Sequence, residues 1–369
     1  MRRSGSLALL TVPLAGLQGC DSDPAQPVAE VLPVGCLGGW QAVSAPMTAE
    51  ISSQLAYQDG HIYITLGRGL ISMAVSDSSE TILSTARAEA LWVEGDHLLL
   101  NGGAHGTQFF SVPLTGGTPA LVTDGTAGRT ELGIGQLHTF LQTSTDFFFA
   151  ESSRVSFTGP TTVWRVPRTG EPPVEIARFT ELDAFGDSAL YFQGVALAPL
   201  GLVLGTTWGV GKFVPLAGGS PRTLAVPDVD NVVLDVGFVG VDARGVYWQV
   251  PKNPEVDPNA RELVVSPVDG SNARPVWSQI PAFSHVVKAW SDGDDGLVLI
   301  VSQFFRGEDR GRTTVWSIDA NGAARRRACA PAGAYIDNTP PAIAPDAFYF
   351  VAWLENQQMQ FIRVPRAAP

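Results

Sequence analysis

The sequence is poor in lysine, cysteine and long apolar runs. Of its 24 basic residues only Lys212, Lys252 and Lys288 are lysines, and 3 of its 369 residues are cysteines. A transmembrane helix needs about 20 apolar residues in a row, and no segment of the chain reaches that length. Neither a Gly-x-Ser-x-Gly nucleophile elbow nor a phosphate-binding or dinucleotide-binding loop occurs. The chain therefore lacks the local motifs that would identify a hydrolase or a nucleotide-binding enzyme.

What is present begins at the N-terminus. Leu17-Gln18-Gly19-Cys20 resembles the lipobox of a bacterial lipoprotein signal peptide, after Arg2-Arg3 and the apolar run Leu7–Leu17. That run has 11 residues, too few to span a bilayer. The resemblance implies cleavage before Cys20, a lipid on Cys20, and a place in the cell envelope facing the periplasm or the cell exterior. The alternative is an ordinary thiol at Cys20 after a Sec-cleaved peptide.

Three segments follow from this interpretation. Residues 1–19 are the signal peptide, residues 20–33, rich in proline and acids, are an extended tether, and residues 34–369 are the folded domain. Loss of residues 1–19 removes two arginines and changes the formal net charge from −12 to −14. Such an acidic surface disfavours nucleic acid and anionic lipid headgroups as partners.

Two cysteines remain after Cys20. In an oxidising compartment, Cys36 and Cys329 are most simply explained as one disulfide. Two buried free thiols are the alternative. Two cysteines alone make a poor metal site.

One octapeptide pattern recurs along the chain and predicts the fold. It reads VPLTGGTP at 112–119, VPRTGEPP at 166–173 and VPLAGGSP at 214–221, with weaker copies at 74–81, 266–273, 318–325 and a truncated one at 364–369. Each copy follows an apolar strand, and in five of the seven a central glycine supplies the positive φ that a tight hairpin requires. The turn centres are Ser78, Gly116, Gly170, Gly218, Gly270, Gly322 and Ala368, separated by 38 to 54 residues.

A second recurring element precedes each hairpin. It is a polar turn followed by a short apolar strand, as in Ile62–Ile64, Leu190–Phe192, Val246–Trp248, Leu297–Leu299 and Phe348–Phe350. Together the two elements make about four strands per repeat, which is typical of propeller blades. We expect an all-β propeller of seven blades, with six or eight as alternatives. Because the last copy stops without its second strand, residues Val34–Val43 are predicted to supply that strand.

The residues GGTPALV (Gly116–Val122) and GGSPRTLA (Gly218–Ala225) resemble the repeats of TolB-type, WD40-like β-propellers. The resemblance covers most of the chain from Tyr57 onward and implies a propeller of six to eight blades. It carries no specific activity, because unrelated functions share this fold.

The search for chemistry finds only dispersed residues. The five histidines are His61, His97, His105, His138 and His285, and none has a zinc-ligand spacing. Asp292–Gly296 resembles half of a calcium loop, but Gln303 stands where such a loop needs a glutamate, so a solvated turn is the better explanation. Arg325–Arg327 is the one basic cluster and is expected at a strand end. Most of the nine tryptophans, including Trp277, Trp316 and Trp353, are expected as packing between blades.

Two functions fit these observations. The first is a non-enzymatic, lipid-anchored envelope module, expected to be monomeric and without a cofactor, whose propeller binds a protein, peptide or glycan. The second is a propeller enzyme, a lyase or a lactonase-like hydrolase, with an axial metal site. No residue of the sequence is assigned a catalytic or metal-binding role, and a bound metal ion would distinguish the two.

Overall fold

The structure is a computed structural model. It describes residues 39–48, 50–51, 53–103, 106–127, 137–152, 160–180, 192–206, 210–225, 236–253, 255–257, 259–281, 284–293, 295–303, 312–330 and 334–366. All of these belong to one compact unit. Cys20, Cys36 and the predicted signal peptide and tether lie outside the described residues, as do His105 and Ala368. No helix in the described part of the chain could span a bilayer.

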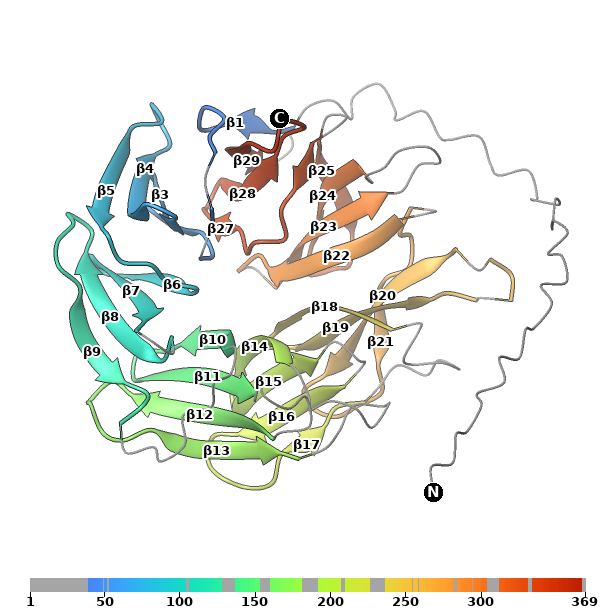
Figure 1. Cartoon of the computed structure of the whole chain (residues 1–369). Helices are drawn as coiled ribbons and strands as arrows, with labels where there is room; N and C mark the ends of the chain where they lie inside the picture. Colours follow the sequence, from blue (N-terminus) through green and yellow to red (C-terminus); the bar gives the residue numbers. More distant parts are fainter. Residues whose placement is uncertain are drawn as a thin grey trace, which may run out of the picture. The chain divides into compact units, whose positions relative to one another are not determined.

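The described strands form seven antiparallel sheets that follow one another around a ring (Figure 1). Blade 1 contains β2 (Ala56–Gln58), β3 (His61–Leu66), β4 (Gly69–Ala74) and β5 (Glu80–Ser84). Blade 2 contains β6 (Leu91–Glu94), β7 (His97–Gly102), β8 (Gln108–Pro113) and β9 (Ala120–Asp124). Blade 3 contains β10 (Leu137–Gln142), β11 (Asp146–Ser152), β12 (Thr161–Pro167) and β13 (Val174–Phe179).

The remaining blades continue in chain order. Blade 4 contains β14 (Phe192–Ala198), β15 (Gly201–Thr206), β16 (Gly211–Pro215) and β17 (Arg222–Thr223). Blade 5 contains β18 (Gly237–Asp242), β19 (Gly245–Pro251), β20 (Arg261–Pro267) and β21 (Arg274–Trp277). Blade 6 contains β22 (Ser284–Ser291), β23 (Leu297–Gln303), β24 (Arg312–Ile318) and β25 (Ala324–Cys329). Blade 7 contains β26 (Tyr335–Ile336), β27 (Ala342–Ile343), β28 (Ala347–Trp353), β29 (Met359–Pro365) and β1 (Gln41–Ala42). The fold is a seven-bladed β-propeller, which confirms the predicted class and blade number.

The hairpin pattern has the conformation that the sequence predicts. The described turn centres all have positive φ, from 61° at Ser78 to 93° at Gly218. In each of the first six blades the turn joins the third strand to the outermost strand. The Val-Pro pair ends the third strand in three of these blades, where the missing N–H of proline costs little.

The second strands are apolar without alternation because they are covered on both faces. In β28, Phe348 and Phe350 pack in the cluster shared with blade 6, whereas Tyr349 and Val351 pack in the cluster shared with blade 1. Successive side chains of a strand point to opposite faces, so one strand serves two interfaces. The described buried apolar residues form seven such clusters, each between two neighbouring blades.

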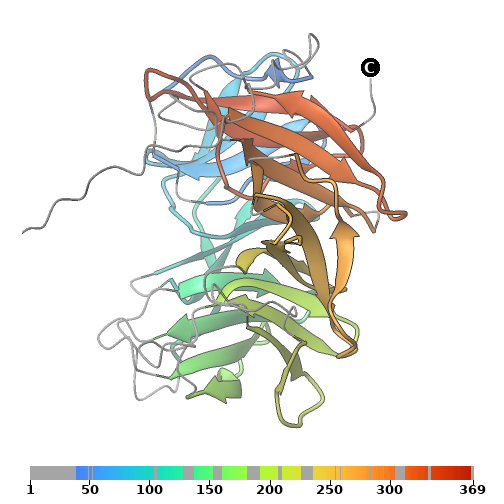
Figure 2. The same cartoon turned by 90° about the vertical axis from the view of Figure 1, so that its right-hand side faces the viewer.

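The N-terminal segment closes the ring, as predicted. Gln41 and Ala42 pair with Arg363 and Ile362 of β29, and the amide of Val43 donates to the carbonyl of Phe361 at 2.8 Å. The buried Val43 side chain then joins the apolar cluster between blades 7 and 1. In Figure 2 the N-terminal strands, in blue, again lie beside the C-terminal strands, in red. Closure removes the open sheet edge at the end of the repeat series.

Candidate functional site

The innermost strands and the loops next to them surround an axial cavity of about 840 Å³. Its wall includes residues from all seven blades, from Glu50 near β2 to Trp353 at the end of β28. Ligand cavities of proteins range from about 300 to 1,000 Å³, so this one suits a small molecule or a short peptide segment. We refer to it as the axial cavity.

Half of the wall is built from full-length strands. The innermost strands β10, β14, β18 and β22 have 6, 7, 6 and 8 residues, and we call this part the long-strand arc. A Cβ on Gly194 of β14 would overlap the side chain of Val241 in β18, and one on Gly240 of β18 would overlap the carbonyl oxygen of Ala289 in β22. Glycine therefore lets these strands approach closely. Their side of the cavity is mostly apolar, with Val195, Phe238 and Val241 on its surface.

The other half of the wall is built from loops. The innermost strands of blades 7, 1 and 2 have only 2 to 4 residues each, and we call this part the short-strand arc. Here the cavity is lined by Glu50, Glu89 and Asp337, which are three of the four charged residues on its wall. Acidic charge is thus concentrated on one side of the cavity.

Side-chain hydrogen bonds hold these loops in place. The buried Asn101 accepts from the amides of Glu89 and Ala90 at 2.9 and 2.7 Å. Gln54 donates to the carbonyl of Leu91 at 2.7 Å, and Asp337 accepts from the indole of Trp353 at 2.8 Å. Polar side chains thus replace the backbone ladder that strands would supply.

The fourth charge is Lys288 of β22, in the long-strand arc. Its ammonium nitrogen lies 4.9 Å from the centroid of the Phe238 ring. Among the described residues it has no hydrogen-bond acceptor and no ion-pair partner. Burial lowers the pKa of Lys288, because the charged form is poorly solvated there.

A second polar group on the wall is also unsatisfied. Thr139 of β10 is 6% exposed, and its Oγ1 has no hydrogen-bond partner in the described part of the chain. A buried hydroxyl without a partner costs about 1–3 kcal/mol. The long-strand arc therefore carries one ammonium and one buried hydroxyl that have no hydrogen-bond partner among the described residues.

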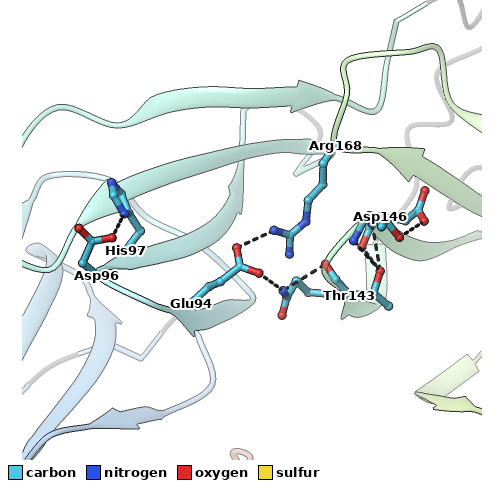
Figure 3. Close-up of polar contacts among 8 residues, drawn as sticks. Glu94, Asp96, His97, Thr143, Asp146 and Arg168 are labelled. Atoms are coloured by element: carbon cyan, nitrogen blue, oxygen red, sulfur yellow. Dashed lines mark hydrogen bonds and ion pairs between the residues drawn. The ribbon is translucent and has the colours of Figure 1, made fainter.

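A further polar cluster lies between blades 2 and 3 and is structural (Figure 3). Arg168, after β12, donates to Glu94 of β6 at 2.6 Å, and Gln142 of β10 donates to the other oxygen of the same carboxylate at 3.2 Å. The guanidinium of Arg168 lies 4.8 Å from the centroid of the buried Phe147 ring. In the same view His97 contacts only its neighbour Asp96, at 2.6 Å. These contacts link two blades without lining the cavity.

The residues singled out in the sequence are dispersed in the structure. His61 contacts Ser72, and His285 is half-buried in β22, where burial lowers its pKa. Neither lines the axial cavity. The side chains of His105 and His138 lie outside the described part. No group of three or more His, Cys, Asp and Glu side chains among the described residues is arranged to hold a metal ion.

The charged runs lie on turns and strand ends. The described residues of Asp292–Gly296 form the turn between β22 and β23, in which Asp292 accepts from the amide of Gly296 at 2.9 Å. Arg325 and Arg326 are exposed on β25. The pairing of Cys36 with Cys329 stays a prediction, because Cys36 lies outside the described residues.

The tryptophans divide into two groups. Trp277 of blade 5 and Trp316 of blade 6 pack with ring centroids 4.9 Å apart, which confirms interblade packing for this pair. Trp290 and Trp353 instead line the axial cavity. Trp353 also packs against the apolar cluster between blades 7 and 1, so the predicted packing describes only part of its surroundings. Sequence reasoning missed Lys288 and Trp290 as wall residues. The sequence does contain one sign of the role of Lys288, because a lysine stands within the otherwise mostly apolar segment HVVKAWS.

Comparison with solved structures supports the fold. The chain aligns with YCF48 bound to D1 peptide at 12% identity and a TM-score of 0.55, covering 90% of this chain and 98% of that one. It aligns with oligogalacturonate lyase from Vibrio parahaemolyticus at 9% identity and a TM-score of 0.57, covering 89% and 94%. YCF48 from Cyanidioschyzon merolae aligns with a TM-score of 0.55, at 12% identity over 89% and 98%. No protein-family model and no curated protein sequence matches this chain. Likeness at these identities establishes the propeller architecture.

Proposed function

We propose that this protein is a lipid-anchored, non-enzymatic envelope module that binds a partner segment in its axial cavity. The observation that carries the proposal is the cavity itself, lined by all seven blades and bearing the ammonium of Lys288, which has no acceptor among the residues that the structure describes. Its acids Asp337 and Glu89 lie in loops fixed by internal hydrogen bonds. This arrangement supports recognition by a rigid wall.

A peptide or protein segment is the partner class that we favour. YCF48, which has the same architecture, was solved bound to a peptide, so a propeller of this kind can hold one. The cavity volume of about 840 Å³ fits a short segment inserted from a larger partner. A glycan is the other ligand class that the sequence left open.

Photocrosslinking in the native envelope tests this proposal. A photoreactive amino acid at Gln193, on the cavity wall, should give a discrete adduct, whereas the same residue at Leu200, 78% exposed on the β14–β15 turn, should not. Val195→Trp, which fills part of the cavity, should abolish the adduct from Gln193. Equal adducts from both positions, or one that survives Val195→Trp, would contradict cavity binding.

The enzymatic alternative has its own readout. Metal recovered stoichiometrically with the purified protein, and lost on neutralising Glu50, Glu89 and Asp337 together, would favour a metalloenzyme over the binding module.

The anchor is a separate part of the proposal. Cys20→Ser should release the protein from the membrane fraction and remove the acyl mass from its N-terminus. Cys36→Ser is the matched control and should remain in the membrane fraction. A mature N-terminus at another residue would refute the anchor without affecting the cavity.

We further propose the disulfide Cys36–Cys329. Its support is that Gly39, three residues after Cys36, packs on the backbone of Arg327 and Ala328, next to Cys329. Closing a loop of nearly the whole domain should stabilise it by about 3 to 5 kcal/mol. Peptide mapping without reduction should recover the linked peptides, and recovery of two free thiols would refute the pairing.

A further inference from the structure

The three lysines of the chain are in three different environments. Lys212 is buried and donates to Oγ1 of Thr223 at 2.9 Å. Lys252 donates to the carbonyl of Ser278 at 2.9 Å. Lys288 has only the Phe238 ring, 4.9 Å away, and it is the lysine that lines the axial cavity. The protein thus satisfies the ammonium groups outside the cavity and leaves the one on its wall without an acceptor from the described residues.

The acids of the cavity do not compensate for this charge. Glu50, Glu89 and Asp337 line the short-strand arc, whereas Lys288 is in the long-strand arc. The pKa of Lys288 is lowered by burial, and no carboxylate in the described part of the chain raises it. The face of an aromatic ring replaces only part of the favourable hydration that an ammonium loses on burial. An anionic group that enters the cavity would therefore find a preformed cationic partner.

The surroundings of Lys288 indicate what carries the anionic group. Phe238, Val241 and Trp290 lie on the same arc, so the wall next to the ammonium offers few hydrogen bonds. Sugars need many polar partners, whereas a peptide can place an apolar side chain beside a carboxylate.

We propose that the axial cavity recognises a carboxylate of a peptide segment, which pairs with the ammonium of Lys288 while adjacent apolar side chains pack on Phe238 and Val241. The inference rests on the proposed binding function and specifies its ligand. The carboxylate belongs either to a chain terminus or to an acidic side chain.

Lysine-selective ¹³C labelling offers a direct test, because the chain has only three lysines. The Cε signal of Lys288 is assigned by its loss in Lys288→Met. We titrate the protein with the peptide acetyl-Ala-Leu-Val-Phe as free acid, as C-terminal amide, and as the amide with glutamate in place of alanine. The free acid or the glutamate peptide should shift the Lys288 signal, and which of them does so identifies the source of the carboxylate. The plain amide should leave the signal unchanged.

Three outcomes would overturn the proposal. The acid and the plain amide could shift Lys288 equally, none of the peptides could shift it, or tetragalacturonate, which carries its carboxylates on a polar body, could be the one probe that does. The signals of Lys212 and Lys252 report non-specific charge effects in the same spectra.

Affinity measurements sharpen the assignment. Lys288→Met should weaken binding of the responding peptide at least about tenfold, as expected for a half-buried charge-assisted bond. Lys252→Met is the matched control and should bind as the parent does, and Lys288→Arg should retain part of the affinity. Equal binding by Lys288→Met and the parent would refute the role of Lys288.

The two proposals fail in distinguishable ways. Photocrosslinking from Gln193 that is blocked by Val195→Trp but unchanged in Lys288→Met would keep cavity binding and remove carboxylate recognition. Loss of crosslinking specificity, with a Lys288 signal that still responds only to carboxylate peptides, would keep the anion site and remove the partner function.

Discussion

The two arcs of the ring build the same cavity by different means. In the long-strand arc, innermost strands of 6 to 8 residues approach closely at glycines and present an apolar wall with one cation. In the short-strand arc, strands of 2 to 4 residues give way to loops that carry three acids and are held by side chains such as Asn101. Backbone pairing thus fixes one wall, and side-chain hydrogen bonds fix the other.

The largest effect is expected where the long-strand arc depends on glycine. Gly240→Ala would place a Cβ against the carbonyl oxygen of Ala289, a backbone atom that cannot move aside by changing rotamer. We expect a loss of at least about 3 kcal/mol in the free energy of unfolding, measured by urea denaturation. The control is Gly67→Ala in the short-strand arc, where the nearest atom would be 3.7 Å away, with an expected change within about 0.5 kcal/mol. Similar losses in both variants would contradict the contrast between the arcs.

The short-strand arc depends instead on the closing segment. Val43→Pro removes the hydrogen bond from the amide of Val43 to Phe361 and disturbs a side chain that is 4% exposed. We expect a loss of about 3 kcal/mol. Ala45→Pro changes an exposed neighbour whose amide donates no hydrogen bond to another described residue, so it should be nearly neutral. Hydrogen exchange should show β29 exposed in Val43→Pro and protected in Ala45→Pro, and protection of β29 in both would refute this role of closure.

Loop support in the short-strand arc should have a smaller effect. Asn101→Ala leaves the amides of Glu89 and Ala90 without their acceptor. Loss of stability should be about 2 kcal/mol, with increased hydrogen exchange at these two amides. Gln142→Ala removes a half-buried amide from the long-strand arc whose hydrogen bond to Glu94 is long and exposed to solvent, so it serves as control and should change stability by less than about 0.5 kcal/mol. An unchanged exchange rate at Glu89 would show that the loop is held in another way.

The smallest effect concerns the charge of Lys288. Because its folded pKa is lowered, the unfolded chain binds more protons between that pKa and the ordinary lysine value near 10.5, so stability from this group rises with pH across that window. Relative to the parent, Lys288→Met should lack this rise in stability and should be more stable than the parent at pH values below the window. The measurement is the difference between the two unfolding curves from pH 7 to 11. Parallel pH dependence in the two proteins would contradict a desolvated ammonium.

The sequence predicted the elements that depend on local conformation. Positive φ at Gly116 or Gly170 is a property of a few consecutive residues, and the octapeptide repeat reports it directly. Four of the five short apolar strands expected after polar turns are second strands of their blades. In blade 4 the described part of the expected strand, Phe192, begins the innermost strand β14, and β15 follows a turn at Pro199-Leu200 without the Asp-Gly signal.

The cavity could not be predicted because no local pattern encodes it. Its wall is assembled from segments as distant as Glu50 and Trp353, and the lengths of the innermost strands decide whether strands or loops line it. Lys288 was visible as a charge in an apolar strand. That no described residue accepts from it depends on where three other blades place their acids, which only the folded ring determines.

Because β1 pairs with β29, the ring can close only after almost the whole chain has been synthesised. Gln41 and its partner Arg363 are 322 positions apart in the chain. At about 5–20 residues per second, the first strand waits roughly 20 to 60 s for the strand that it completes. Throughout that time blade 7 does not exist and blade 1 has no neighbour on one side. The nascent chain is thus an open series of blades, and every product that stops before β29 keeps two unprotected ends that a quality-control protease can recognise.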